Sequence, residues 1–308
     1  MKPEGGLPGP PRPAGFFRRV GVVLDMIRFE HTLFALPFAF LGALLALRGL
    51  PPRPPGQWAW PPPSTWLWIL AAMVFARSAA MAFNRLVDER LDRMNPRTRD
   101  RALPAGLLGR TFVGGFTFLC CVGFLVSAGM LNRLCALLSL PALVVILFYS
   151  FTKRFTVLSH FVLGYALSIA PEGSWIAVTG QFSVPVIIVC LIVVTWTAGF
   201  DILYACQDAA FDARERLHSI PGRLGVPRSL RLSFLLHLLT ILCLGVFHVM
   251  FRLSWVAAGG MALLAALLVW EHRLVAPGDL SRVNRAFFNV NALFSTGLFL
   301  VVLADVTV

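Results

Sequence analysis

Long apolar stretches recur along the whole chain and constrain its fold more than any other feature. The hydrocarbon core of a bilayer requires about 20 apolar residues of α-helix to cross it. Nine stretches approach this length, at roughly 29–48, 65–86, 111–130, 134–150, 157–178, 184–204, 229–250, 253–271 and 286–304. With 57% hydrophobic and 14% charged residues, the chain has more apolar surface than one water-soluble core can bury. We therefore predict an all-α, polytopic membrane protein with nine transmembrane helices.

The N-terminal segment differs from the rest of the chain. Its first 15 residues are rich in Pro and Gly, which predicts a disordered tail at 1–17. Residues 18–308 are expected to form a single nine-helix domain in the lipid bilayer. The apolar run near Phe29 begins too late for a simple signal peptide, so we expect it to remain as a membrane helix.

Basic residues are distributed unevenly between the predicted loops. The N-terminal segment and the loops on its side, at 85–110, 151–156, 205–231 and 272–285, hold 22 of the 27 Lys and Arg residues, whereas the alternate loops hold four. Cytoplasmic loops of membrane proteins carry such an excess. We therefore expect the N-terminus and the large basic loops in the cytoplasm. The same bias accounts for the net charge of +12, and we expect no nucleic-acid partner.

Two groups of polar residues stand where predicted spans meet the cytoplasmic boundary. The first, spaced i, i+4, i+8, consists of Asn84, Asp88 and Asp92. The second, spaced i, i+3, i+7, i+11 within DILYACQDAAFD, consists of Asp201, Tyr204, Asp208 and Asp212. Either spacing lines up one face of a helix. Carboxylates stacked in this way repel one another, and pairing with nearby arginines is the alternative to a shared cation. Oxygen ligands favour Mg²⁺, which also bridges to substrate phosphates.

Basic and tyrosine side chains on the same side suit a polyanion. Arg97 and Arg101 follow the first acidic group, and the segment YSFTKRFT supplies Tyr149, Lys153 and Arg154. Lys and Arg bind phosphate oxygens. For any one arginine, the cytoplasmic excess of positive charge is an alternative explanation that needs no ligand.

Arg77 lies inside the second predicted span, about two turns before Asn84. An ionisable residue within a membrane is expensive and indicates a functional site. We interpret Arg77 as a counter-ion for an anionic substrate, with Arg28 from the first helix as a weaker contributor. The alternative is a structural pair between Arg77 and an acid on a neighbouring helix.

These parts suggest a reaction at a lipid-embedded site. Mg²⁺ held by carboxylates would bind a diphosphate, and basic residues would neutralise charge as the diphosphate leaves. Apolar helices suit a long lipid tail, which makes a polyprenyl diphosphate the natural substrate. Aromatic faces would stabilise the resulting allylic cation.

Three segments carry a resemblance to a known family. NRLVDERLD followed by NPRTRDRALPAG resembles the first aspartate-rich motif of the UbiA superfamily of membrane prenyltransferases, and DILYACQDAAFD is similar to the second. YSFTKRFT resembles the Tyr-x-x-x-Lys segment of that family. The resemblance implies a UbiA-type bundle of nine helices in a bacterial inner membrane, with the N-terminus and the active site facing the cytoplasm.

The resemblance also implies a role for each matching position. The metal ligands would be Asn84, Asp88, Asp92, Asp208 and Asp212. The diphosphate would contact Tyr149, Lys153, Arg154, Arg97 and Arg101. The catalytic residues would be Asp88, Asp92, Asp208, Asp212, Lys153 and Tyr204. Arg77, and less strongly Arg28, would bind an aromatic acid, while Asp201 would line the second helix.

One position departs from the family pattern, because Arg85 stands where many members have Asp after the motif's Asn. That Asp is not one of the spaced ligands, so the expected metal site is unchanged. This form, with NPRT, HSIP and DLSRVNRAFF, resembles a 4-hydroxybenzoate polyprenyltransferase-like subgroup. The acceptor would be 4-hydroxybenzoate or 1,4-dihydroxy-6-naphthoate, in ubiquinone or menaquinone biosynthesis.

A secondary transporter of an anionic substrate is the alternative from another functional class. Transporter sites lie near the bilayer midplane on broken helices. Here the acidic residues cluster at one membrane face, which favours the enzyme. Substrate flux into sealed vesicles without a prenylated product would favour the transporter.

Overall fold

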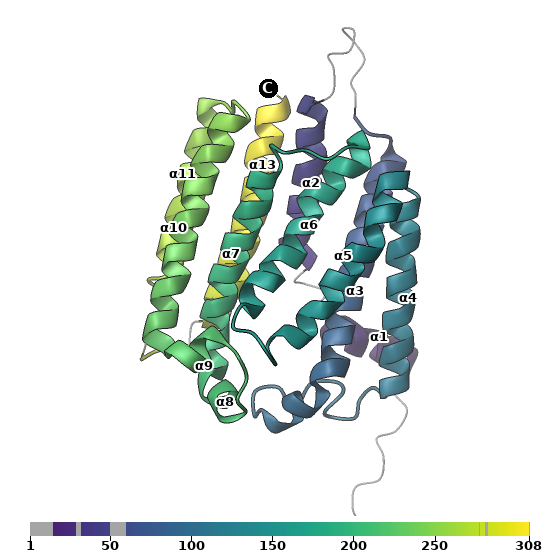
Figure 1. The fold of residues 1–308 in the computed structure, drawn as a ribbon, viewed down its shortest axis with the longest axis vertical. Coiled ribbons are helices and arrows are strands. Elements are labelled where there is room, and N and C mark those ends of the chain that lie inside the picture. Colours follow the sequence, from purple (N-terminus) through teal and green to yellow (C-terminus); the bar gives the residue numbers. More distant parts are fainter. Residues whose placement is uncertain (1–14, 29–31, 50–59, 277, 281–282, 308) are drawn as a thin grey trace, which may run out of the picture.

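The computed structural model describes residues 15–28, 32–49, 60–276, 278–280 and 283–307. These residues are predominantly helical and contain no β-strand, as predicted (Figure 1). The helices are α1 (Phe16–Met26), α2 (Thr32–Gly49), α3 (Pro63–Met94), α4 (Arg110–Gly129), α5 (Arg133–Thr152), α6 (Ser159–Thr179), α7 (Ile187–Ala205), α8 (Ala209–Arg214), α9 (Ile220–Leu224), α10 (Val226–Met250), α11 (Trp255–Glu271), α12 (Val283–Arg285) and α13 (Asn291–Thr307). A 3₁₀ turn, Cys206–Asp208, joins α7 to α8, and a π-helical turn, Ala286–Val290, precedes α13.

The nine predicted spans correspond to α2, α3, α4, α5, α6, α7, α10, α11 and α13. Seven helical segments in the described part of the chain are long and apolar enough to cross a membrane. The other two are shorter, since the apolar part of α2 is Ala35–Leu47 and α11 is Trp255–Glu271. A multi-pass membrane protein is therefore supported, while the count of nine spans stays a prediction. Residues 29–31 of the first predicted span lie outside the described residues.

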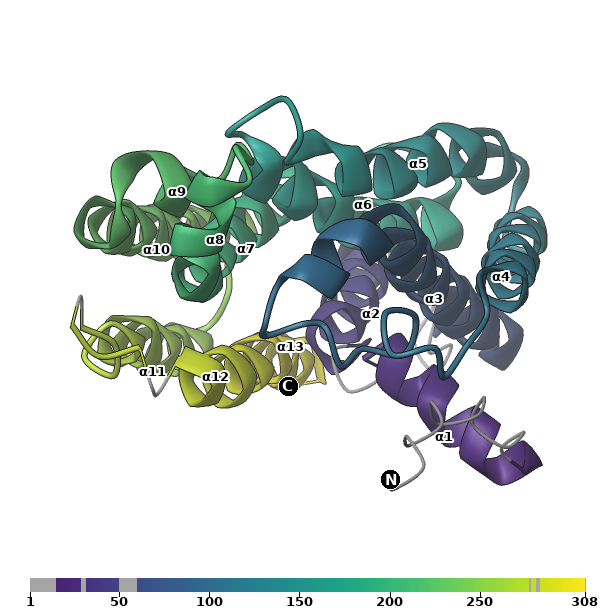
Figure 2. The ribbon, with the colours of Figure 1, turned by 90° about the horizontal axis from the view of Figure 1, so that it is seen from below.

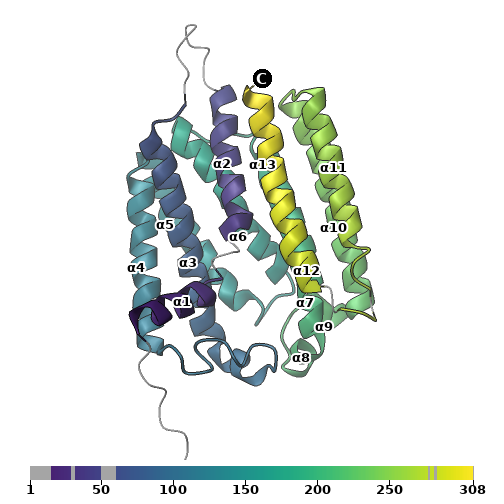
Figure 3. The same ribbon diagram turned by 180° about the vertical axis from the view of Figure 1, so that it is seen from behind.

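The predicted tail at 1–17 lies outside the described residues except at its end, where α1 begins at Phe16. This helix lies across the lower end of the bundle, beside α3 (Figures 2 and 3). Met26 and Ile27 are buried there against Leu103 and Leu108 of the loop that follows α3. The N-terminal helix thus packs against the loop that follows the first acidic group.

The helix α7 lies at the centre of the packing. It contacts α6 on one side and α10 on the other. Its fully buried Trp196 lies 5.1 Å from Phe38 of α2, 4.8 Å from Phe200 and 5.4 Å from Phe294 of α13, measured between ring centroids. Aromatic pairs at these separations stabilise a core beyond the area that they bury. The second acidic group begins near the C-terminal end of this well-packed helix.

Two glycines allow neighbouring helices to approach closely beside α6. A Cβ added at Gly42 of α2 would lie 2.0 Å from the carbonyl oxygen of Pro171, and one at Gly164 would lie 2.7 Å from that of Val194. Small residues at helix contacts are typical of membrane bundles. The outer faces are apolar instead, as on α5, where Leu137, Leu140 and Val144 are largely exposed. A bilayer is the environment in which such a face is not costly.

The loops predicted to share one side lie together at one end of the bundle. The connections after α3, α5 and α7 and the helix α1 lie at the lower end, and α13 finishes at the upper end (Figures 1 and 3). This alternation agrees with the uneven distribution of basic residues. It also brings both acidic groups to the same end of the molecule.

Candidate active site

The first acidic group lies on the uninterrupted helix α3. No Gly or Pro follows Pro63 within this helix, so one helical register continues from the apolar part into the charged part. Asn84, Asp88 and Asp92 therefore face the same cavity, as their spacing predicted. The Asn84 Nδ2 donates a hydrogen bond of 3.0 Å to Asp88.

The second acidic group is not on one continuous α-helical face. α7 ends at Ala205, and the 3₁₀ turn Cys206–Asp208 intervenes before α8 begins at Ala209. The assumption of a single α-helical face from Asp201 to Asp212 is therefore wrong. Despite this change of helical period, the four side chains of the group line one cavity. They are Asp201, Tyr204, Asp208 and Asp212.

We call this space of about 180 Å³ the polar cavity. Its charged lining consists of the carboxylates Asp88, Asp92, Asp201, Asp208 and Asp212 and the cations Arg85, Arg97, Arg101, Lys153 and Arg154. The acids and the cations are equal in number. The carboxylate and Arg or Lys charges of the cavity wall therefore nearly cancel.

Each acid of the first group is paired with an arginine. The Arg154 guanidinium donates to Asp88 at 2.9 Å, and that of Arg101 donates to Asp92 at 2.7 Å. Asp92 lies 3.9 Å from Arg85 as well. Arg154 also donates to the backbone carbonyl oxygens of Ser150 and Val87, so it links the end of α5 to α3.

The second group is paired in the same manner. Lys153 Nζ lies 2.8 Å from the buried carboxylate of Asp212. The Arg97 guanidinium forms two hydrogen bonds to Asp208, one of them 2.9 Å from its Nε, and a third of 2.9 Å to the Tyr204 hydroxyl. The pairing with arginines that the sequence left open as an alternative is thus present in the structure. The four pairs join α3, the segments that follow α3 and α5, the 3₁₀ turn and α8.

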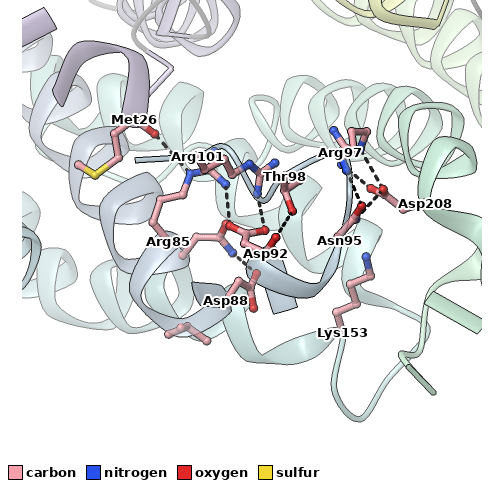
Figure 4. A network of polar contacts seen from close by, with 12 residues as sticks. Met26, Arg85, Asp88, Asp92, Asn95, Arg97, Thr98, Arg101, Lys153 and Asp208 are labelled. Carbon is pink, nitrogen blue, oxygen red and sulfur yellow. Dashed lines mark hydrogen bonds and ion pairs between the residues drawn. The ribbon is translucent and has the colours of Figure 1, made fainter. Parts of the chain in front are cut away.

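Arg97 joins the two acidic groups, because it follows the first group in sequence and contacts the second in space (Figure 4). Asn95 supports it by donating to Asp208 at 3.0 Å. Burial by itself lowers the pKa of the Arg97 guanidinium, but its hydrogen bonds to Asp208 and Tyr204 outweigh burial and raise that pKa above the usual value. Arg97 is therefore a permanent cation at the cavity wall.

Two buried carboxylates of the polar cavity have an oxygen with neither a hydrogen bond nor a close ion pair within the described residues. They are Asp92 and Asp212, each at its Oδ2, in residues that are 6% and 0% exposed. A buried polar atom of this kind is costly unless a ligand satisfies it. Oxygen donors from two helices at one cavity fit a hard divalent cation such as Mg²⁺. The residues predicted as metal ligands are thus suited to that ion.

A second space of about 320 Å³, the apolar cavity, extends between α3, α5 and α6. Alanine, leucine, isoleucine and methionine side chains form most of its wall. It meets the polar cavity at residues that line both spaces. These are Asn84, Arg85, Arg101, Tyr149, Asp201 and Tyr204.

Arg77 lines the apolar cavity from α3. Its Nε is buried and receives no hydrogen-bond partner from the described residues, and no ion pair within them involves its guanidinium. The predicted alternative, an ion pair between Arg77 and an acid of a neighbouring helix, is absent from the residues that the structure describes. Arg28 lines the same cavity, but it is half-exposed and lies 3.6 Å from Asp25. Of the two, Arg77 is the better placed to receive a buried anion.

Three residues of the site were not predicted from the sequence as members. Asn95 contacts Asp208 across 113 positions of the chain. His160 is buried on α6 and its Nδ1 lies 2.6 Å from Asp201. Arg85, noted only as a departure from the family pattern, lies between Asp92 and the carbonyl oxygen of Met26. Only Asn95, beside the first acidic group in the motif NPRT, had a signal in the sequence.

Comparison with known proteins agrees with the resemblance in the sequence. Residues 35–294 match the model of the UbiA prenyltransferase family. A 4-hydroxybenzoate octaprenyltransferase of Vibrio parahaemolyticus is 30% identical over 205 residues, which are 66% of this chain and 72% of that protein. An enzyme of the same name from Sodalis glossinidius is 31% identical over 205 residues, with 66% and 70% covered.

Solved structures show the same fold. The apo structure of a UbiA homologue from Aeropyrum pernix superimposes with a TM-score of 0.78 at 30% identity, over 90% of this chain and 98% of that one. A homologue from Archaeoglobus fulgidus, bound to GPP and Mg²⁺, gives a TM-score of 0.65 at 18% identity, over 91% and 99%. The expectation of a membrane-embedded prenyltransferase fold is confirmed: the chain belongs to the UbiA prenyltransferase family.

Proposed function

We propose that the protein transfers a polyprenyl group from a polyprenyl diphosphate to a hydroxylated aromatic carboxylic acid. The acceptor is 4-hydroxybenzoate or 1,4-dihydroxy-6-naphthoate, and the product enters respiratory quinone biosynthesis. Relatives named 4-hydroxybenzoate octaprenyltransferase, at about 30% identity, support an aromatic acceptor. The proposal rests mainly on one observation, the meeting of a charged cavity with an apolar cavity that contains Arg77.

The polar cavity is the proposed site of the diphosphate. Asp88, Asp92, Asp208 and Asp212, with Asn84, would hold Mg²⁺. When bound, this ion withdraws electron density from the diphosphate and makes it a better leaving group. A fold relative solved with GPP and Mg²⁺ supports this choice of metal.

Because the acids are paired with cations, binding of metal and diphosphate would require an exchange of ion-pair partners. Asp88, Asp92, Asp208 and Asp212 each pair with an Arg or Lys. If these acids held Mg²⁺, Arg97, Arg101 and Lys153 would be free to bind phosphate oxygens. Arg154 is the least free to move, because two backbone carbonyl oxygens also hold it. Metal and diphosphate together therefore suit a neutral cavity better than either one alone.

The apolar cavity is the proposed site of the prenyl chain and the aromatic ring. The reaction breaks the bond from the first prenyl carbon to the diphosphate oxygen and forms a carbon–carbon bond to the ring, which then loses a proton. Tyr149 and Tyr204 line the junction and offer aromatic faces to the allylic cation. Arg77 would bind the carboxylate of the acceptor, and the apolar wall would exclude water.

The location that follows is a bacterial inner membrane, with the N-terminus and the polar cavity facing the cytoplasm. The excess of Lys and Arg in the connections at the lower end of the bundle supports this orientation. Accessibility of single introduced cysteines, at α1 and at the loop between α10 and α11, tests it. Labelling from the periplasm at α1 would contradict it.

The experiment that tests the function is mass spectrometry of products from the purified protein. Geranyl diphosphate and Mg²⁺ are supplied with each aromatic acid in turn. We expect a product heavier than one acid by a geranyl group in place of a hydrogen, and none without Mg²⁺. Failure with both acids, while the protein remains monodisperse in detergent, would refute the proposed acceptors. Flux of the acids into sealed vesicles without product would support transport instead.

A further inference from the structure

A second group of metal-ligating side chains lies outside both cavities. It consists of His237 on α10, Glu271 at the end of α11 and the following His272. No residue of α10 or α11 lines the polar or the apolar cavity. The proposed prenyl transfer therefore does not use this group.

The three ligand atoms lie close enough to share an ion. His237 Nδ1 is 2.9 Å from His272 Nε2 and 3.4 Å from a carboxylate oxygen of Glu271, and all three atoms lie within 4.8 Å of one another. Zinc bonds of about 2.0–2.2 Å in a tetrahedron separate neighbouring ligand atoms by about 3.4 Å. The observed separations are near that value, so a small shift of the side chains would suit the ion.

The hydrogen bonding of His237 fixes which nitrogen is available. Its Nε2 lies 3.3 Å from the carbonyl oxygen of Trp196, to which it donates as Nε2–H. The Nδ1 lone pair then points toward Glu271 and His272. Metal-bound histidines commonly donate their second ring nitrogen to a backbone carbonyl in this manner. Gly199 leaves room for the ring, since a Cβ there would lie 2.4 Å from it.

Glu271 is the residue that most requires a cation. It is 0% exposed, and neither carboxylate oxygen accepts a hydrogen bond from any residue in the described ranges. His237, its nearest partner, is 1% exposed and, in the tautomer set by Trp196, offers the carboxylate a lone pair rather than a proton. A buried carboxylate beside two histidines is satisfied by a metal ion.

We propose that His237, Glu271 and His272 bind a divalent ion of the zinc class, separate from the predicted Mg²⁺ site. Two imidazoles and one carboxylate suit Zn²⁺ or Co²⁺, whereas Mg²⁺ prefers oxygen ligands. The ion would join the end of α11 to α10 and, through the Trp196 carbonyl, to α7. Its role would be to hold α10 and α11 against α7, the helix that carries Asp201 and Tyr204 of the second acidic group.

The test measures metal content and needs no prenyl substrate, so its outcome is independent of the proposed function. The protein, carrying a tag without histidine, is purified in detergent from zinc-supplemented cells and analysed by mass spectrometry for metals. We expect about one zinc ion per chain. After replacement by Co²⁺, we expect the strong visible absorption of a tetrahedral site. A wild-type protein without zinc and without this absorption would overturn the proposal.

Variants locate the ion. Glu271→Gln and His272→Gln should each lose most of the zinc, while His248→Gln, on the same helix α10 but outside the group, should keep it. Asp208→Asn should also keep it, because Asp208 belongs to the polar cavity. If Glu271→Gln does not fold, His272→Gln decides, since His272 is only partly buried. Unchanged zinc in both ligand variants would refute the site.

Discussion

The polar and apolar cavities differ in whether their charged side chains are paired. In the polar cavity four acids are paired with basic side chains at 2.9 Å or less, whereas Arg77 in the apolar cavity has no ion pair with any residue that the structure describes. Paired charges in water-accessible space can exchange partners when a ligand arrives. An unpaired guanidinium in apolar surroundings instead favours one anion of matching shape. The first arrangement suits a leaving diphosphate and the second a retained acceptor.

The largest expected effect is on the paired acids. Asp208→Asn keeps the shape of the side chain but removes the charge that would hold the metal. We expect kcat to fall by about 100-fold to 1,000-fold, the order of effect for removing one group that stabilises the transition state. Product formation under saturating Mg²⁺ measures it. Asp88→Asn should behave alike, and near wild-type turnover in both folded variants would contradict the assignment of the polar cavity.

A change at Arg77 should act on the acceptor rather than on the diphosphate. Arg77→Gln would remove the proposed charged hydrogen bond to the acceptor's carboxylate, so we expect KM for the aromatic acid to rise about 10-fold to 100-fold. The KM for geranyl diphosphate should change little. The matched control is Arg28→Gln, which should have a smaller effect because Arg28 is half-exposed beside Asp25. Equal effects of both variants would contradict a specific role of Arg77 in binding the acceptor's carboxylate.

Neutrality of the polar cavity predicts cooperative binding. Mg²⁺ alone would meet the cations and diphosphate alone would meet the acids, so each should bind weakly without the other. We expect each to raise the affinity for the other about tenfold, and the effect must be reciprocal. Titration calorimetry with Mg²⁺, in the presence and absence of inorganic diphosphate, measures it. Independent binding would mean that the acid–cation pairs remain intact when ligands bind.

The smallest effect is expected at Glu89, an acid within the first acidic segment that faces away from the cavity. Its side chain, 13% exposed, pairs with the exposed Arg93 at 3.0 Å and the exposed Arg110 at 2.6 Å. Surface ion pairs contribute about 0–1 kcal/mol, so Glu89→Gln should keep activity within about twofold of wild type. Assays beside Asp88→Asn, one position away, compare the two faces of α3. A large loss in Glu89→Gln would show that charge, rather than position, matters there.

Local spacing predicted the first acidic group well and the second less well. Asn84, Asp88 and Asp92 share a face because nothing interrupts α3. From Asp201 to Asp212 the prediction assumed one α-helix, whereas the 3₁₀ turn Cys206–Asp208 separates α7 from α8 there. Helical periodicity can be counted in a sequence, whereas a local change of period depends on how the segment packs against its neighbours.

The partners of the charged residues could not be predicted. The contact of Asn95 with Asp208 and that of His160 with Asp201 join residues 113 and 41 positions apart in the sequence. The same is true of His237 and Glu271, which lie on different helices with no motif between them. Such contacts depend on helix packing, which many apolar side chains set jointly.

The sequence by itself determined the class of protein, its helical segments, the two acidic groups and the resemblance to a prenyltransferase family. Hydropathy and helical spacing are local properties, so they can be read without coordinates. Only the tertiary structure decided that each acid holds a particular cation, that Arg77 has no acidic partner among the described residues, and that two histidines meet a buried glutamate. These results depend on distances between segments, which close packing of α7 against its neighbours fixes.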